Sequence, residues 1–413
     1  MKLSKPKISQ GLTIILVILG YVGYLASCTN EDTIIEPATP AATNELISVK
    51  VTTPPTLDGT IEAVWDQATK LSTQVEVPNP ENDVFTGYVG NTNDLTLRSL
   101  YDDQNIYLLA EWIDDDKSTK HQTWYFDPTA KRWKQESAYP TFTNSLETRK
   151  AFNEDKLAFL FNINKSTLGF DTKTCYSTCH TNLTVDPATG LPTTPGVSGG
   201  TARHYTNASN ERVDMWHWKS VRDGGMGGLA DDQYQDNQRP NGRKSDSKVS
   251  GGTTNNTISL TITGTATVVA VPKYLIPTRE NYDWIEKAEI TAGTAKLVTA
   301  VDENGVLTLA DNSTIDPNVE TGYQRAGADV GPKAIPFIIT EPIVGNYGDI
   351  SAVGVYTGTG WVVEIKRLLK TTDAVNQDVD FTSLEDQPFG VSIFDRADKA
   401  HGIKPNLVLK FKK

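Results

Sequence analysis

Short runs of β-branched and aromatic residues, each ended by turn-forming residues, recur along this chain and constrain its fold more than any other feature. The segment LTLRSLYDDQNIYLLAEWID at 95–114 contains two such runs around a turn at 102–105. Alternation of side chains between two faces is typical of β-strands, and helical periodicity is scarce here. Further strands are predicted at 156–164, 257–271, 350–369 and 406–413. The sequence therefore predicts an all-β protein, an antiparallel β-sandwich of jelly-roll or immunoglobulin-like type with long loop insertions.

The N-terminus predicts a secreted and lipid-anchored protein. Three lysines precede an apolar run at 12–25, which is shorter than the roughly 20 residues that a membrane-spanning helix prefers. The ending LASC resembles the bacterial lipobox, which implies that residues 1–27 are a signal peptide and that Cys28 is acylated. The alternative is an uncleaved transmembrane anchor. We expect attachment to the outer membrane, facing the periplasm or the cell surface.

The remaining chain predicts a tether followed by one domain. Residues 28–46 are rich in Pro, Thr and Ala, as flexible tethers are. Residues 47–413 are expected to form the β-sandwich, with insertions near 181–256 and 275–345. The net charge of −12 argues against sequence-independent binding to nucleic acid, which requires a basic surface.

The motif TCYSTCH at 174–180 carries the strongest chemical signal. In the c-type haem signature C-x-x-C-H, two thiols bond to the haem and the histidine ligates iron. Here Cys175 and Cys179 enclose three residues, and His180 follows directly. If Cys28 carries lipid, these two cysteines are the remaining ones, in an oxidising compartment where c-type haem and disulfides both persist.

Spacing and compartment favour covalent haem with His180 as the proximal ligand. A disulfide between Cys175 and Cys179 would close a very short ring and stabilise the fold little. The residues alone nevertheless leave the disulfide, another metal and free thiols as alternatives. Zinc is disfavoured because a Cys-Cys-His trio has no paired fourth ligand nearby.

The run VDMWHWKS offers candidates for a second iron ligand, which in c-type proteins is usually His or Met. As a strand it would place Met215 and His217 on one face, and Trp216 and Trp218 on the other. The first face could supply a ligand, and the second could supply pocket aromatics. Alternatively, both tryptophans pack the core and His217 bonds a loop.

The last hairpin offers another set of candidates. Strands at 389–394 and 406–411 flank a turn that presents Lys399, His401 and Lys404. A hairpin tip suits a distal ligand because the strands fix its position. A solvated loop histidine is the alternative.

Several motifs in order resemble the ethylbenzene dehydrogenase-type haem-binding domain. PTLDGTIEAVWDQA at 55–68 is similar to the opening of sandwich domains related to family 9 carbohydrate-binding modules. It is followed by DDQNIYLLAEWIDD, WHWK, GTGWVVEIKRLL and the closing FGVSIFD hairpin. The resemblance covers nearly everything after the tether, although the insertions align poorly.

The resemblance implies a haem-binding electron-transfer protein. In the family's dehydrogenase subunits, Met and Lys hold haem b, and electrons come from a separate molybdenum subunit. This chain adds a cysteine motif, as family members that resemble c-type cytochromes do, and lacks a clear matching Met. The resemblance thus implies His180 as first ligand and His401 as second. The other candidates for the second ligand are Lys404, Lys399, Met215 and His217.

We therefore expect a lipoprotein with one covalent haem c that relays single electrons to an unknown redox partner protein, or acts as the haem subunit of a dehydrogenase or reductase complex. No catalytic residues are predicted. The alternative is a carbohydrate- or ligand-binding lipoprotein of the same fold with a Cys175–Cys179 disulfide. Trp112, Trp124 or Trp133 would then stack on sugar.

Overall fold

The computed structural model describes residues 44–78, 85, 87–139, 141–142, 148–149, 151–178, 204–238, 242–372 and 376–413. The predicted signal peptide, Cys28 and most of the tether lie outside the described residues, as do Cys179 and His180. In the described part of the chain, no helix combines the length and apolar character needed to cross a bilayer.

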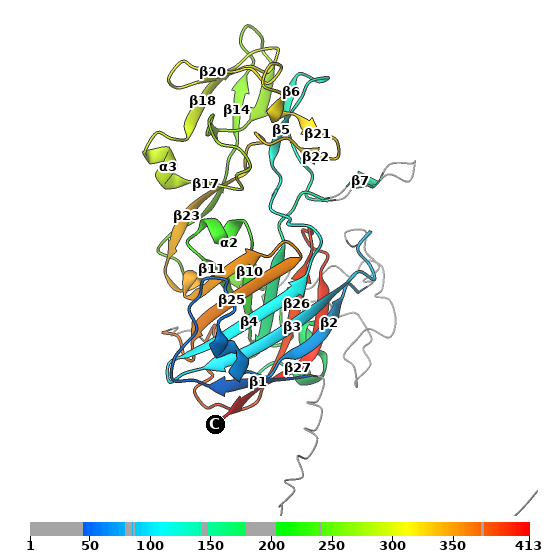
Figure 1. Cartoon of the computed structure of the whole chain (residues 1–413), viewed down its shortest axis with the longest axis vertical. Coiled ribbons are helices and arrows are strands. Elements are labelled where there is room, and N and C mark those ends of the chain that lie inside the picture. Colours follow the sequence, from blue (N-terminus) through cyan, green and yellow to red (C-terminus); the bar gives the residue numbers. More distant parts are fainter. Residues whose placement is uncertain are drawn as a thin grey trace, which may run out of the picture. The chain divides into compact units, whose positions relative to one another are not determined.

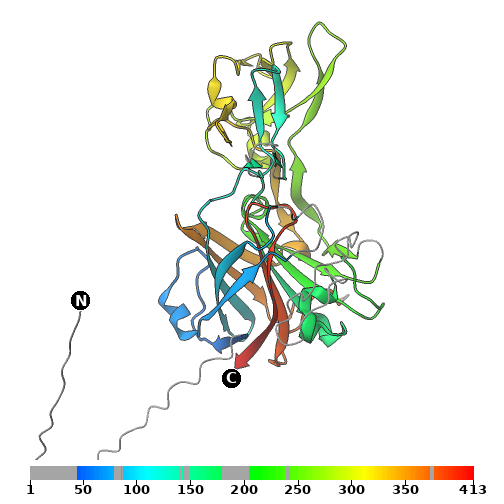
Figure 2. The ribbon, with the colours of Figure 1, turned by 90° about the vertical axis from the view of Figure 1, so that its right-hand side faces the viewer.

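Ten strands of the described chain form a closed ring of hydrogen-bonded neighbours (Figure 1). In order they are β27 (Gly402–Lys412), β2 (Leu71–Glu76), β3 (Thr92–Tyr101), β4 (Asn105–Ile113), β25 (Gly360–Leu368), β24 (Ile350–Tyr356), β11 (Leu229–Gln235), β10 (Val213–Lys219), β9 (Lys156–Asn162) and β26 (Gln387–Phe394). The pairing of β26 with β27 closes the ring, and Figure 2 shows these two strands side by side in red tones. Strand β1 (Glu45–Lys50) pairs in parallel with β27 and β3, and β12 (Arg243–Ser245) extends β11.

Two narrow seams divide this ring into halves. Strands β2 and β27 share only the pair Glu76 and Ile403, and β11 and β24 share two pairs at Leu229 and Ala230. Elsewhere the ladders are long, as between β25 and β4 from 360 to 368. The predicted all-β class is confirmed. The structure differs from a sandwich of separate sheets because the edge strands pair across the seams, which leaves fewer unpaired backbone groups.

Both faces of the central strands are buried, which the alternating sequence alone does not reveal. On β4, Ile106 and Leu108 point into the main core, whereas Tyr107 and Leu109 pack in a second cluster with Trp65. The main core also takes the aromatic side chains Trp112, Phe159, Phe161, Trp216, Trp218, Trp361, Phe381 and Phe389. The second face of this strand is therefore covered by the chain that precedes β2.

The first and fourth motifs of the resemblance meet at one buried carboxylate. The indole Nε1 of Trp65 donates to Oε1 of Glu364 at 2.9 Å, and the backbone N–H groups of Asp58 and Gly59 donate to its Oε2. Glu364 lies on β25, and Gly59 has a φ of 79°, which suits glycine. These contacts explain why LDG, the tryptophan and the WVVEI strand occur together in the sequence.

One buried arginine is shared by three buried aspartates within the barrel. Arg367 of β25 lies 3.5 Å from Asp214, 3.8 Å from Asp232 and 3.1 Å from Asp378, and its guanidinium stacks over Trp216 at 5.1 Å. Burial raises the pKa of Asp214 to about 7 and that of Asp232 well above its usual value. Burial works against the charged arginine as well, but these carboxylates raise its pKa. The cluster is therefore held together by one cation.

A second set of strands has its own apolar core, which includes Trp124, Phe126, Leu275, Leu307 and Ile335. Its elements are β5 (Trp124–Asp127), β6 (Arg132–Gln135), β13 (Ser250–Asn255), β14 (Ile258–Thr261), β15 (Val268–Val271), β16 (Tyr274–Leu275), β17 (Ile285–Glu286), α3 (Lys287–Thr291), β18 (Lys296–Val301), β19 (Leu307–Leu309), β20 (Thr314–Ile315), β21 (Arg325–Ala326), β22 (Asp329–Val330) and β23 (Ile338–Val344). The predicted insertion at 275–345 lies here.

The predicted insertion at 181–256 is partly barrel, because β10 and β11 lie within it. The remaining helices and strands are short. They are β7 (Thr141–Phe142), β8 (Thr148–Arg149), α1 (Phe170–Lys173) and α2 (Arg222–Gly225), together with the 3-10 turns η1 (Ala63–Gln67), η3 (Ile163–Lys165), η4 (Thr174–Ser177), η5 (Thr321–Tyr323) and η6 (Asn346–Gly348).

Candidate functional site

A cavity of about 320 Å³ brings together Cys175, His204, Met215, His217 and His401. These residues come from four separate segments of the chain, because Met215 and His217 share β10, and three of them were predicted candidates for the haem site besides Cys175. The volume lies at the lower end of the roughly 300–1,000 Å³ typical of ligand pockets. The cavity is therefore the first place to look for a bound group.

Three adjacent strands form one wall of the cavity in matched rows. The register of β9 with β10 and β26 places Lys219, Lys156 and Phe394 in one row. The next row is His217, Ala158 and Ser392, and the third is Met215, Leu160 and Gly390; all nine residues line the cavity. Small residues at the centre of this wall leave the hollow. Met215, His217 and Lys219 thus share a face, as the predicted alternation requires.

Trp216 and Trp218 point away from this cavity, into the main core. Trp216 packs against Phe161 and Phe381, and Trp218 packs against Trp112 and Trp361. Their predicted place as pocket aromatics is taken by Phe85 and Phe394, which line the cavity and contact His401.

Cys175 sits in the turn η4, which is fastened to β27. The hydroxyl of Thr174 accepts the backbone N–H of Asn406 at 2.7 Å, and Thr174 has a φ of 45°. Cys175 is half-buried and packs on one side in a cluster with Met215 and on the other with Ile403. Cys179 and His180 follow Thr178, the last described residue of this segment. The first cysteine of the motif is thus held at the cavity wall.

His401 has the hydrogen-bonding pattern of a metal-ligating histidine. Its Nδ1 lies 2.6 Å from the backbone oxygen of Lys399. A carbonyl can only accept, so Nδ1 carries the proton and Nε2 carries the lone pair. Burial, with a contribution from His204, lowers the pKa of His401 to about 4, which keeps the ring neutral. Histidines that bind metals commonly donate their other ring nitrogen to a carbonyl in this way.

His217 has the opposite tautomer. Its Nδ1 lies 2.9 Å from Nη2 of Arg243, and a guanidinium can only donate, so Nδ1 accepts and Nε2 carries the proton. That Nε2 is buried and has no hydrogen-bond partner among the described residues. Burial and the nearby Lys219 and Arg243 lower the pKa of His217 well below its usual value. His217 therefore offers the cavity a hydrogen-bond donor rather than a lone pair.

Basic side chains surround the two histidines. Lys156, Lys219, Arg222, Arg243 and Lys399 all line the cavity. Several are already paired, because Arg222 binds Glu154, Lys219 binds Asp231, and Arg243 binds Gln233. Burial lowers the pKa of Lys156 to about 8 and that of Lys219 to about 7. This electrostatic environment suits an anionic group inside the cavity.

The aromatic ring of Phe394 lies against both histidines. It stacks on His401 with ring centroids 4.5 Å apart and on His217 at 5.3 Å. Phe394 is the last residue of β26, and no feature of the sequence singled it out. Of the remaining predicted ligands, Lys399 lines the cavity and Lys404 does not.

The sequence interpretation also missed His204, Arg243 and Lys156. His204 and Arg243 lie in a segment that was predicted to be an irregular insertion. Lys156 could have been found, since it begins the strand that pairs with the VDMWHWKS run. A lysine at the end of an otherwise apolar strand was the available signal.

The tryptophans that the carbohydrate-binding alternative requires are not exposed. Trp112, Trp124 and Trp133 are 3%, 2% and 5% exposed. The indole of Trp124 donates to the oxygen of Asn256, and that of Trp133 donates to the oxygen of Gly305. None of the three offers a face on which a sugar could stack.

Comparison with known proteins identifies one family. A family model described as ethylbenzene dehydrogenase matches residues 62–404. No curated protein matches the chain. Two similar solved structures are those of a family 9 carbohydrate-binding module from Caldicellulosiruptor kristjanssonii, in complex with glucose and with cellotriose. Each is 9% identical and covers 89% of this chain, and the matches cover 96% and 94% of the two modules with TM-scores of 0.27 and 0.26. Similarity this low carries no argument about ligands.

Proposed function

This chain belongs to the ethylbenzene dehydrogenase family, and we propose that within it the protein is a c-type haem-binding electron-transfer lipoprotein. Its haem is bonded to Cys175 and Cys179 and ligated by His180 and His401. When bound, haem iron supplies reversible one-electron transfer. The protein relays electrons to a partner protein or serves as the haem subunit of a larger oxidoreductase.

The observation that carries this proposal is the shared cavity. Cys175, the first residue of the attachment motif, lines the same cavity as His401 and His217, although these residues are far apart in sequence. A short disulfide loop would not need a cavity lined by histidines and basic side chains. A haem needs an apolar wall, an imidazole lone pair and partners for two propionates.

Different residues of the cavity meet each of these three needs. Leu160, Phe394 and Ile403 provide apolar surface against which the haem ring can pack. The lone pair of His401 on Nε2 suits an axial ligand, and the carbonyl of Lys399 orients the ring. The buried N–H of His217 and the guanidinium of Arg243 suit a propionate, because both donate. His217 is therefore assigned to the carboxylate and His401 to the iron.

Covalent attachment is tested on a denaturing gel stained for haem peroxidase activity, with the full chain co-expressed with haem-maturation proteins. The wild-type band is expected to stain, because thioether bonds survive denaturation. Cys175→Ala leaves at most one thioether and is expected to change the pyridine haemochrome spectrum. Cys28→Ala, which removes the remaining cysteine of the chain, should leave staining unchanged. A wild-type band without stain would contradict covalent haem.

The lipid anchor is proposed from the LASC motif alone and has its own test. Wild-type protein is expected in the membrane fraction, and Cys28→Ala in the soluble envelope fraction, because Cys28 is the acylated residue. Immunoblots of separated fractions measure the shift. Ser27→Ala is the matched control and should stay in the membrane fraction, because it keeps a small residue before Cys28. Membrane retention of Cys28→Ala would favour an uncleaved anchor instead.

A further inference from the structure

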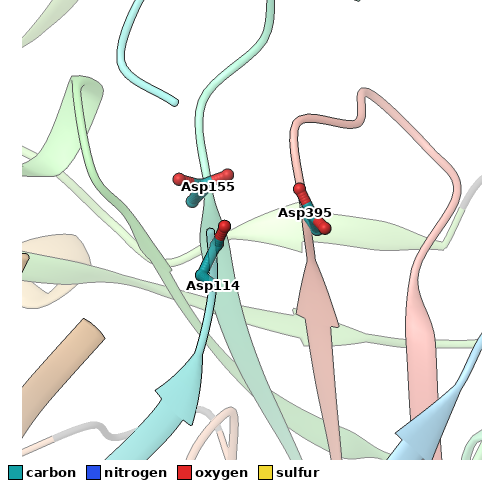
Figure 3. A group of neighbouring side chains, drawn as sticks. All are labelled: Asp114, Asp155 and Asp395. Carbon is teal, nitrogen blue, oxygen red and sulfur yellow. The ribbon is translucent and has the colours of Figure 1, made fainter. Parts of the chain in front are cut away.

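Three carboxyl groups converge at one end of the barrel, on residues that do not line the histidine cavity. Asp114 follows β4, Asp155 precedes β9 and Asp395 follows β26, so three strands end at one point (Figure 3). The closest ligand oxygens of the three residues all lie within 4.8 Å of one another. Two ligands about 2.4 Å from one Ca²⁺ ion are separated by at most about 4.8 Å, so the spacing suits a shared cation.

One oxygen in this group lacks the partner that its burial requires. Asp114 is 4% exposed, and its Oδ1 accepts the backbone N–H of Asp116 at 3.0 Å. Its Oδ2 is buried and forms no hydrogen bond of good geometry among the described residues, although the nearby indole of Trp112 lowers the pKa of Asp114. Figure 3 shows the Asp114 carboxyl group directed toward Asp155. A buried carboxylate oxygen without a well-aligned donor is costly unless a cation binds it or a proton neutralises it.

The neighbouring arginine does not supply that cation. Arg396 follows Asp395 in sequence, but its guanidinium binds Asp116 at 2.6 Å and Ser118 at 2.9 Å. Among the described residues, neither Asp114 nor Asp155 forms an ion pair. Burial is the main cause that raises the pKa of Asp155 well above its usual value, and the nearby charge of Asp114 adds to it. Burial also raises the pKa of Asp114 to about 6, with a smaller contribution from Asp395. The carboxyl groups of Asp114 and Asp155 thus lie close together, and the guanidinium of Arg396 is bound to neither of them.

The existing contacts of Asp155 hold it in place without using up its lone pairs. Its Oδ2 accepts the N–H of Ser118 at 2.8 Å and the indole N–H of Trp361 at 3.0 Å, and its Oδ1 accepts the N–H of Arg396 at 2.9 Å. Each carboxylate oxygen has two lone pairs, so Oδ1 retains one for a metal. Asp155 therefore resembles a ligand that is positioned in advance.

Solvent reaches this group through a cavity of about 470 Å³. Asp114 and Asp395 line it, together with Asn91, Asn93 and Asp116. The lining offers further side-chain oxygens and room for water, and Ca²⁺ takes six to eight oxygen ligands with flexible geometry. Mg²⁺ demands a tighter octahedron and gives up its water reluctantly, which this open arrangement does not favour.

We propose that Asp114, Asp155 and Asp395 bind one Ca²⁺ ion, which ties the ends of β4, β9 and β26 together. Strand β4 lies in one half of the ring, and β9 and β26 lie in the other. The ion therefore joins the two halves at one end of the barrel, in addition to the indole contact from Trp361 of β25 to Asp155. The site is separate from the haem proposal, and its test needs no haem signal.

Isothermal titration calorimetry of the full chain, freed of divalent ions, tests the binding. We expect one Ca²⁺ per chain, and Asp114→Asn should weaken its affinity at least about tenfold because it removes a charged ligand. Asp171→Asn is the matched control, since Asp171 is exposed and does not line this cavity, and should bind within about twofold of wild type. Absence of saturable binding up to about 5 mM Ca²⁺, unchanged binding by Asp114→Asn, or tighter binding of Mg²⁺ would overturn the proposal.

Thermal unfolding distinguishes ligation from a purely structural role. In chelator, Asp114→Asn should be at least as stable as wild type, because it removes one of three like charges. In excess Ca²⁺ only the wild type should gain about 2 °C or more in Tm. Asp395→Asn, at a half-buried position, should behave the same way and serves if Asp114→Asn folds poorly. The proposal would be overturned if both variants had a Tm below that of wild type by the same amount in chelator and in Ca²⁺.

Discussion

Replacing Arg367 with leucine is expected to lower the free energy of unfolding by about 3–5 kcal/mol, because it leaves Asp214, Asp232 and Asp378 buried without their cation. Domains are typically stable by about 5–15 kcal/mol, so this loss is a large share of the total. Leucine fills much of the same volume, so the effect reports charge more than packing. Urea unfolding followed by tryptophan fluorescence measures it.

Two further variants sharpen this result. Lys366→Leu changes the adjacent, half-buried cation on the same strand and should shift stability by no more than about 0.5 kcal/mol. Adding Asp232→Asn to Arg367→Leu should recover part of the loss, because it removes one unpaired charge. If the arginine variant unfolded at the wild-type urea concentration, the assignment of Arg367 as the counterion would be wrong.

The second large effect is expected at the proposed distal ligand. His401→Ala should convert a six-coordinate low-spin haem spectrum into a high-spin one, because the alanine variant has no imidazole lone pair at this place. Added imidazole should restore the low-spin bands, since it fills the same coordination position. Visible absorption of the purified protein measures both changes.

His204 and His217 provide matched controls for this experiment, because both also line the cavity. His204→Ala should keep the low-spin spectrum. His217→Ala should also keep it but change the reduction potential, because the proposed partner of its Nε2–H is a propionate rather than iron. A low-spin spectrum that survives His401→Ala and disappears in His217→Ala would exchange their roles. Survival in all three would direct attention to Met215 and Lys399.

The class of the fold could be predicted from the sequence because strand alternation is a local property. Ring closure could not, because it depends on pairs that are distant in sequence, such as Glu76 with Ile403. The two-sided burial of β4 was hidden for a related reason. Tyr107 looks like an outward-facing residue until the chain around Trp65 covers it.

The candidate site was only partly predictable for the same reason. Met215 and His217 were singled out from one strand, and His401 from one hairpin, by residue type. Arg243 and the carbonyl of Lys399 decide which of the two histidines has its lone pair on Nε2. Neither contact has a local signal in the sequence. The acidic group of Asp114, Asp155 and Asp395 was invisible among many carboxylates because its members are widely separated in sequence.

The two seams of the ring have a consequence for how such a protein can diverge. Every strand that lines the histidine cavity, namely β9, β10, β12, β26 and β27, belongs to the same half of the ring. Substitutions in β2, β3, β4, β24 and β25 can reach the cavity through the shared core or through the seams, as at Glu76 beside Ile403. The half that lines the cavity can therefore keep those side chains while the other half changes to suit new neighbours, which separates the inheritance of the cavity from that of the outer surface.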